Sequence, residues 1–151
     1  MPAVTFVIHS PAPYHVELFD ALAARPGMQI TVIYVHAHEH GRQWTEPRFA
    51  HRALFLKDTD SARTAVQECE LLVMGFHEHP ASRQWMRLRL ASGKKWAFWG
   101  ENPGAHLRGR LGRWLRRWRL RWLRASAAPV WAIGTRAVDA YRAEIGGARE
   151  V

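Results

Sequence analysis

AVTFVIHSPAPYHVELFDALAARPGMQITVIYV, the stretch from residue 3 to residue 35, decides the fold of this chain. Its two apolar, β-branched runs, at residues 3–8 and 29–35, predict strands that are buried on both faces. Between them, apolar residues at helical spacing predict a helix over residues 14–24, which ends at Arg25-Pro26-Gly27. Strand, helix and strand in this order form a βαβ unit, whose crossover is right-handed in nearly all proteins. We therefore expect a parallel sheet with functional loops at the carboxyl ends of its strands.

The rest of the chain continues this alternation. Further strands are expected at residues 52–57, 71–75, 95–99 and 129–133, and further helices at 62–68, 81–91, 107–124 and 135–145. This pattern predicts an α/β fold, a Rossmann-like doubly wound parallel sheet of about six strands with flanking helices, in the order 3-2-1-4-5-6. The switch point then lies between the first and fourth strands, which places His9-Ser10 beside Gly75-Phe76-His77 at the mouth of one crevice. No repeat or linker divides the sequence, so we expect a single domain over residues 1–151.

Composition narrows the class of protein. The length of 151 residues and the hydrophobic share of 48% are typical of one globular domain. Cys69 is the single cysteine, which excludes a disulfide within the chain and fits a reducing compartment. The first apolar run is too short for a signal peptide or a membrane span. We therefore expect a cytoplasmic protein, with a peripheral position at the inner face of the membrane as a further option.

Neither a cofactor nor a metal is expected from the motifs. The first loop, HSPAPYH, lacks the glycine pattern of a dinucleotide or phosphate site, and its prolines remove amide donors. His36, His38 and His40 alternate, as do His77 and His79, and alternate residues of extended backbone share a face. Three imidazoles can bind a metal, but no cysteine lies nearby. A solvated loop is the better interpretation of this histidine pattern.

The expected helix at residues 107–124 is the strongest single pattern. Nine arginines and no acidic residue lie between Asn102 and Val138, and they account for the whole net charge of +9. At 100° per residue one apolar stripe contains Leu107, Leu111, Trp114, Leu115, Trp118 and Trp122. The stripe can pack on the sheet, or it can enter a bilayer while the arginines meet anionic headgroups. We expect a helix that docks by this stripe and offers its arginines to an anionic surface.

The residues expected to serve that surface are Arg113, Trp114, Arg116, Arg117, Trp118 and Trp122. Nucleic acid is the weaker option for this helix. Arginine can neutralise phosphate, but the tryptophans share the apolar face instead of alternating with the arginines as stacking platforms.

Glu101 is the candidate catalytic residue. It follows the expected strand at residues 95–99 directly, in Trp99-Gly100-Glu101. A carboxylate at the end of a strand in such a sheet is well placed to act as a general base. It can equally cap the following turn or pair with an arginine, and both interpretations stay open at this point.

The order of these motifs resembles the N-terminal domain of family-4-like glycosyltransferases of the GT-B fold. In that family a strand leads to a Pro-x-Pro-Tyr loop, a helix of the LFxALA type and a second strand, as residues 4–35 do here. The later segments that agree are Gly41-Arg42-x-Trp44, Leu71-Leu72-Val73-Met74-Gly75, Trp99-Gly100-Glu101 and Ile133-Gly134-Thr135-Arg136-Ala137 with Tyr141. The similarity runs through nearly the whole chain.

The resemblance implies an enzyme that moves a sugar from a nucleotide-sugar donor to an acceptor, which can be lipid-linked. It assigns acceptor contacts to Pro13, Tyr14 and His77 and a polar catalytic position to Glu101. The family's C-terminal donor-binding domain would begin where this sequence stops, at Val151. We therefore expect the acceptor half, inactive alone and prone to self-association through the surface meant for its missing partner. The alternative is a non-catalytic Rossmann-like binding module that attaches to anionic membrane or an acidic partner through residues 107–124.

Overall fold

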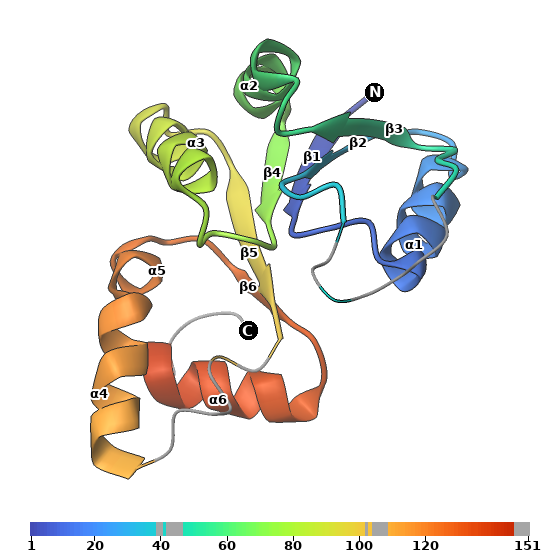
Figure 1. The fold of residues 1–151 in the computed structure, drawn as a ribbon. Coiled ribbons are helices and arrows are strands. Elements are labelled where there is room, and N and C mark those ends of the chain that lie inside the picture. The colour runs from blue at the N-terminus through green and yellow to red at the C-terminus, as the bar shows by residue number, and fades with distance from the viewer. Residues whose placement is uncertain (39–40, 42–46, 102, 104–108, 147–151) are drawn as a thin grey trace. The chain divides into compact units, whose positions relative to one another are not determined.

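The computed structural model describes residues 1–38, 41, 47–101, 103 and 109–146. Within this part of the chain, six parallel strands form one sheet in the order β3-β2-β1-β4-β5-β6, which confirms the doubly wound, Rossmann-like fold and its strand order (Figure 1). The strands are β1 (Ala3–Ile8), β2 (Gln29–Tyr34), β3 (Arg52–Phe55), β4 (Leu71–Met74), β5 (Trp96–Gly100) and β6 (Val130–Ala132). The βαβ unit at the start of the chain is therefore correctly predicted, with β1 and β2 paired along their full lengths.

Helices follow most of the strands, as the alternation predicted. They are α1 (Pro13–Ala23), α2 (Thr59–Glu68), α3 (Pro80–Ala91), α4 (Gly109–Arg119), α5 (Arg121–Ala125) and α6 (Thr135–Ile145). The chain divides into two compact units, residues 1–96 and 97–151, which we call the N-terminal unit and the C-terminal unit and describe separately. None of the described helices has the length and apolar character that a membrane span requires.

In the N-terminal unit, helices cover both faces of the sheet. Figure 1 shows α1 on one side of the strands and α2 with α3 on the other. Neighbouring residues of β1 reach opposite faces because side chains alternate along a strand. Phe6 packs against Phe19 of α1 with ring centroids 4.8 Å apart, whereas Thr5 donates from Oγ1 to the Ala65 carbonyl of α2 at 3.2 Å. The core of this unit therefore lies in two layers, one on each face of the sheet.

Arg89 of α3 is buried and links this helix to neighbouring segments of the N-terminal unit. Only 2% of this residue is exposed. Its guanidinium donates to the carbonyl oxygens of Val66 at 3.2 Å, Cys69 at 2.7 Å, Glu70 at 2.9 Å and Lys95 at 2.9 Å. Carbonyl groups at the end of a helix carry partial negative charge, so the end of α2 is a suitable place for a buried cation. Arg89 thus joins α3, the end of α2 and the segment that leads into β5.

In the C-terminal unit, aromatic rings gather around Phe98 of β5. Trp122 of α5 and Tyr141 of α6 both meet the Phe98 ring edge-on, with centroids 5.4 Å and 5.9 Å away. Gly100 follows in the same strand, where a Cβ would lie 2.5 Å from the Tyr141 hydroxyl and 2.8 Å from the Phe98 ring. Glycine at this position therefore allows β5 to approach α6 closely.

The basic helix differs from its prediction in two ways. It ends at Arg119, and a separate helix, α5, begins after Leu120, whose ψ of 7° departs from helical geometry. The expectation that the apolar stripe packs on the sheet is wrong for Leu111, Trp114 and Trp118, which are exposed. Leu115 and Trp122 of the same stripe are half-buried, and Trp122 packs on Phe98 of β5. Leu107, the first residue of the expected stripe, lies outside the described residues.

The side of α4 that packs inward explains this orientation. Gly112 is buried on that side, and Arg116 reaches from it to Glu144 of α6, Nε to Oε1 at 2.9 Å. Residues four apart lie one turn above each other on a helix, so these two positions define the inner face of α4. The exposed residues of the predicted stripe, Leu111, Trp114 and Trp118, lie on another side of the helix. The ion pair with α6 therefore docks α4 in an orientation that leaves these three side chains outside.

Candidate functional site

Three histidines gather in the N-terminal unit, beyond the carboxyl ends of β1, β2 and β4. The backbone brings the loops together, because the Gly75 and Phe76 amides donate to the Val7 carbonyl at 2.9 and 3.0 Å, and the His36 amide donates to the His9 carbonyl at 2.8 Å. This is the switch point of the sheet, where ligands bind in open α/β folds. The expected meeting of the loop at His9 with the loop at Phe76 is therefore confirmed.

Ring contacts define what we call the histidine cluster, in which His9 and His36 lie against Phe76 and His79 lies against His36. The His9 ring centroid lies 4.8 Å from that of His36 and 4.7 Å from that of Phe76. The His36 and His79 centroids are 6.1 Å apart and their planes are nearly perpendicular. The cluster thus draws one imidazole from each of three separate loops.

Local hydrogen bonds orient two of these imidazoles. The Ala81 amide donates to Nδ1 of His79 at 3.2 Å at the start of α3, so the neutral ring carries its hydrogen on Nε2. Nδ1 of His9 lies 3.1 Å from Oγ of Ser10, a hydroxyl group in a residue only 3% exposed. His79 can therefore offer an Nε2–H donor to a ligand oxygen, and an imidazole of this cluster can take up a proton from a hydroxyl group.

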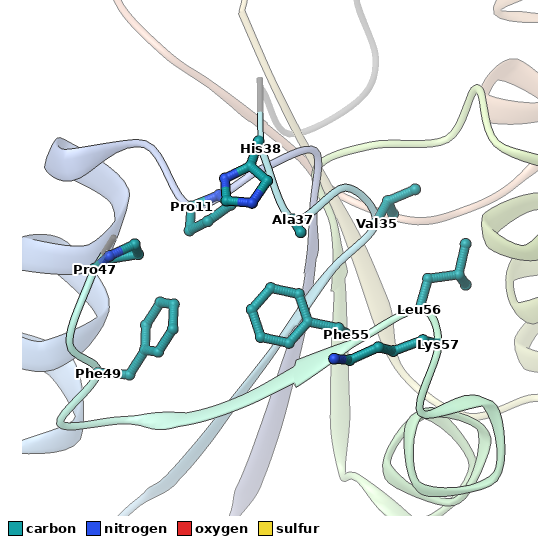
Figure 2. A pocket seen from close by; sticks show the side chains of 9 residues that line it. All are labelled: Pro11, Val35, Ala37, His38, Pro47, Phe49, Phe55, Leu56 and Lys57. Carbon is teal, nitrogen blue, oxygen red and sulfur yellow. The ribbon is translucent and has the colours of Figure 1, made fainter. Parts of the chain in front are cut away.

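A pocket of about 390 Å³ lies at the same edge of the sheet, within the N-terminal unit. Figure 2 shows its lining, which comes from the end of β1, the end of β2, the segment before β3 and the end of β3. The lining residues are Pro11, Val35, Ala37, His38, Pro47, Phe49, Phe55, Leu56 and Lys57. Most are apolar, and Lys57 adds an ammonium group 5.9 Å from the centre of the Phe55 ring. Such a lining suits a ligand with an apolar part and a few polar groups.

A chain of hydrogen bonds holds one wall of this pocket and joins half-buried Asp20 to buried His51 and Tyr34. Asp20 of α1 accepts hydrogen bonds at Oδ1 from the Ala50 amide and the His51 amide, both at 2.9 Å, and from the His51 ring at Nδ1. Nε2 of the same ring lies 3.1 Å from the Tyr34 hydroxyl at the end of β2. Because His51 is two residues from Phe49, these bonds fix the segment that forms the wall. We call Asp20, His51 and Tyr34 the polar relay.

The contacts within the polar relay shift the pKa values of Asp20 and Tyr34. Burial acts to raise the pKa of Asp20, but hydrogen bonds from His51 and Ala50 and the charge on His51 outweigh it and hold that pKa below its usual range. Burial, together with the charge of Asp20, raises the pKa of Tyr34 well above its ordinary value. The carboxylate and the neutral phenol are thus the stable forms in the folded protein.

The residues that the resemblance assigned to the acceptor lie in different surroundings. His77 belongs to the loop that carries Phe76 and His79, and its carbonyl accepts from Nε of Arg83 at 3.3 Å. Pro13 and Tyr14 start α1 and are exposed, and neither is among the described residues that line the pocket. Tyr14 packs its ring on that of His15, with centroids 4.2 Å apart. Of these three residues, His77 lies closest in the chain to the histidine cluster.

Glu101 belongs to the C-terminal unit, where it is exposed just after β5. Burial raises the pKa of Tyr141 well above its ordinary value, and the charge of Glu101 adds to this effect. Glu101 therefore lies in the electrostatic field that acts on the Tyr141 hydroxyl, beside Gly100. A capping or pairing role and a role as a base both remain compatible with this exposed position.

The metal interpretation of the alternating histidines finds no geometric support. Among the described residues, no group of three or more His, Cys, Asp or Glu side chains has an arrangement that could hold a metal ion. His36 turns into the histidine cluster and His38 lines the pocket, while His40, Arg42 and Trp44 lie outside the described residues.

Sequence reasoning missed the polar relay and the position of Phe49 in the pocket wall. The relay joins residues that are 31 positions apart, Asp20 and His51, and no motif marks either of them. The only sequence signal for this contact was weak, namely an aspartate directly after Phe19 of the apolar pattern of α1.

A comparison with protein-family models finds no family that matches this chain, and a search of curated proteins finds no match either.

Proposed function

We propose that the N-terminal unit binds the acceptor of a glycosyl transfer reaction at the histidine cluster and the adjoining pocket. The observation that carries this proposal is the meeting of three imidazoles from separate loops at the carboxyl edge of a parallel sheet. The resemblance to family-4-like glycosyltransferases supplies the reaction class. An acceptor with a sugar hydroxyl and an apolar aglycone or lipid fits the two parts of the site.

The two parts would divide the work between them. Phe49, Phe55 and Pro11 would receive the apolar part of the acceptor, which gains free energy from leaving water. An imidazole of the histidine cluster would accept the proton of the attacking hydroxyl, a role that histidine fills most often in proteins. Glycosyl transfer also needs a donor held in a cleft that excludes water. We therefore expect the 151-residue chain to bind acceptor and to show no turnover of nucleotide sugars without a donor-binding half.

Histidine-selective NMR tests this proposal on the full chain. Imidazole signals would be followed while n-octyl β-D-glucopyranoside, below its micelle concentration, is added as an acceptor-like probe. We expect the signals of His36 and His79 to move with this probe and to remain in place with glucose or UDP-glucose. Movement with UDP-glucose alone would mean a donor site, and no movement with any probe would reject the proposal.

Variants sharpen the binding test. His36 is exposed, so His36→Ala should weaken octyl glucoside binding while the melting temperature stays unchanged. Leu90→Ala, at an exposed position of α3, is the matched control and should bind as the wild type does. Tyr14→Ala tests the assignment that the resemblance made, since Tyr14 is 58% exposed and its loss should cost little stability. Unchanged binding in Tyr14→Ala would remove this residue from the site.

The two candidate bases can be separated in an enzyme completed by a donor-binding half. Loss of a general base lowers kcat by about 10²–10⁴-fold. Glu101→Gln should cause a loss of this size if Glu101 is the base, whereas His36→Ala should cause it if the cluster is. Because Glu101 is exposed, its amide variant should keep the wild-type melting temperature. Wild-type kcat in Glu101→Gln would leave it a structural carboxylate.

A further inference from the structure

Helix α4 presents three large apolar side chains to solvent on successive turns. Leu111 is 77% exposed, Trp114 is 62% exposed and Trp118 is 52% exposed. Their spacing of three and four residues puts them on one side of the helix, and we call them the α4 stripe. Contiguous apolar patches of this kind mark interaction sites in proteins.

The α4 stripe is held outward by contacts on other sides of the helix. Arg116 binds Glu144 with two nitrogens, Nε at 2.9 Å and Nη2 at 2.7 Å from Oε1. Arg117 adds a contact of 3.4 Å from Nε to Oε2 of Glu144 and donates to the Ala143 carbonyl at 3.3 Å. Glu144 is only 5% exposed, so turning the stripe inward would leave a carboxylate without these guanidinium partners in the interior of the unit.

Positive charge surrounds the α4 stripe. Arg110 of α4 is exposed and directly precedes Leu111 of the stripe. Arg121 starts α5 and is also exposed, and its guanidinium sits 4.4 Å from the centre of the Trp118 ring. No acidic residue occurs in the sequence between Asn102 and Val138. Arg116 faces Glu144 instead, so it does not serve the outer surface that the sequence had assigned to it.

An anionic bilayer is the occupant that matches this surface. Tryptophan and leucine enter the boundary between headgroups and acyl chains, while arginine meets lipid phosphates. A second copy of the chain would bring a like-charged arginine border against this one, which opposes pairing through the stripe. Nucleic acid favours tryptophans that alternate with arginines, whereas Leu111, Trp114 and Trp118 form one uninterrupted apolar line.

We propose that α4 is an interfacial anchor that lies on anionic membrane. Leu111, Trp114 and Trp118 enter the bilayer surface, and Arg110 and Arg121 contact lipid headgroups. The contacts of Glu144 with Arg116 and Arg117 keep the anchor exposed before the membrane is met. The anchor and the proposed acceptor site share no residue, so the anchor stands whether or not the chain binds a sugar acceptor.

Vesicle flotation of the full chain tests the anchor. Vesicles of phosphatidylcholine alone and of phosphatidylcholine with phosphatidylglycerol would be compared at low and high salt. We expect binding to the anionic vesicles at low salt and its loss at high salt, because salt screens the arginine contacts. The double variant Trp114→Ala/Trp118→Ala should lower partitioning about tenfold or more, because apolar area drives insertion. Its melting temperature should stay at the wild-type value.

Matched variants separate membrane binding through the anchor from nonspecific membrane binding. Arg110→Gln and Arg121→Gln should each lower partitioning about fivefold. Arg136→Gln removes the same charge from an exposed position of α6 and should lower it far less. Trp122→Ala removes a tryptophan that packs on Phe98, so it should lower the melting temperature instead. If the tryptophan double variant fails to fold, the arginine variants still decide the question.

Three results would overturn the proposal. The first is no binding of the wild type to anionic vesicles at low salt. The second is binding that Trp114→Ala/Trp118→Ala leaves unchanged and that polyglutamate or DNA matches, which would indicate charge attraction alone. The third is a wild-type oligomer in sedimentation velocity that the same double variant dissociates, which would make the stripe a contact between copies.

Discussion

Helices α1 and α4 are both amphipathic in sequence, yet only α1 buries its apolar face. In α1, Val16 and Phe19 are 7% and 0% exposed, whereas in α4 Leu111 and Trp114 are 77% and 62% exposed. The charged contacts of the two helices explain the difference. Asp20 of α1 follows Phe19 directly and binds the segment at Ala50 and His51, so the same side of α1 carries both its apolar and its polar contacts.

In α4 the exposed apolar residues and the arginine that forms the ion pair lie on different sides of the helix. Arg116 lies away from the α4 stripe and binds the buried carboxylate of Glu144. Arg89 of α3 behaves in the same way, because it is 2% exposed while the adjacent Leu90 is 42% exposed. An apolar pattern therefore identifies residues that share a face, and the partners of the charged residues decide whether that face points inward.

The largest expected effect comes from exchanging one aromatic residue on each helix. Phe19→Ala should lower the free energy of unfolding by about 3–5 kcal/mol, because it empties a fully buried site. Trp114→Ala should change it by less than about 0.5 kcal/mol, as is usual for an exposed position. Urea unfolding followed by circular dichroism measures both. A destabilised Trp114→Ala variant would show that α4 packs by its stripe after all.

Glu144→Gln should release α4 from α6. The amide removes a charge that faces Arg116 and Arg117, and hydrogen bonds to charged groups contribute about 1.5–3 kcal/mol. We expect a loss of that size in urea unfolding and faster cleavage by trypsin within α4. Asp139→Asn, at an exposed position of α6, is the control that should leave both measurements unchanged. Wild-type cleavage in the Gln variant would mean that other contacts hold α4.

Asp20→Asn should weaken the corresponding tie of α1, by about 1.5 kcal/mol at neutral pH. The folded pKa of Asp20 is lowered, so its contribution is present above the unfolded value of about 4 and is lost as the pH falls through the folded pKa. Unfolding free energies of the wild type and the variant should therefore converge in acid. Parallel curves from pH 7 to pH 2 would contradict this assignment.

The smallest effect should appear at alkaline pH and concerns Tyr34 of the N-terminal unit and Tyr141 of the C-terminal unit. The pKa values of Tyr34 and Tyr141 are raised in the folded protein. Each neutral phenol therefore contributes its full stabilisation at pH values below the unfolded pKa of about 10. This stabilisation is lost as the pH rises above that value towards the folded pKa. Tyr141→Phe should therefore lose about 0.8 kcal/mol less than the wild type between pH 8 and pH 10.5. Equal losses would mean that Tyr141 ionises freely in the folded protein.

Much of the fold could be predicted because short β-branched runs alternate with helical spacing throughout the chain. Right-handed crossovers then limit the possible strand orders, and the expected order is the observed one. The element boundaries were less accurate. The expected third strand at residues 52–57 ends at Phe55, and Leu56 and Lys57 line the pocket instead. The expected helix at residues 107–124 is interrupted at Leu120, which is buried.

The candidate site was predictable only where strand order places loops side by side. The approach of His9 to Phe76 followed from the switch point between β1 and β4. The entry of His36 and His79 into the same cluster did not, because loop conformation decides where these side chains turn. The link between Asp20 and His51 depends on a contact between α1 and the segment before β3, for which a single sequence carries no signal.

The sequence by itself determined the element types, the parallel sheet, its strand order and the edge at which loops can form a site. These properties depend on local periodicity and on the handedness of crossovers, which neighbouring residues specify. Only the tertiary structure decided which side of α3 and of α4 faces inward. That choice depends on buried partners such as Glu144, and on the carbonyl groups around Arg89, which lie far away in sequence. Removing a charge from water is costly unless such partners are in place, so their positions override the apolar pattern.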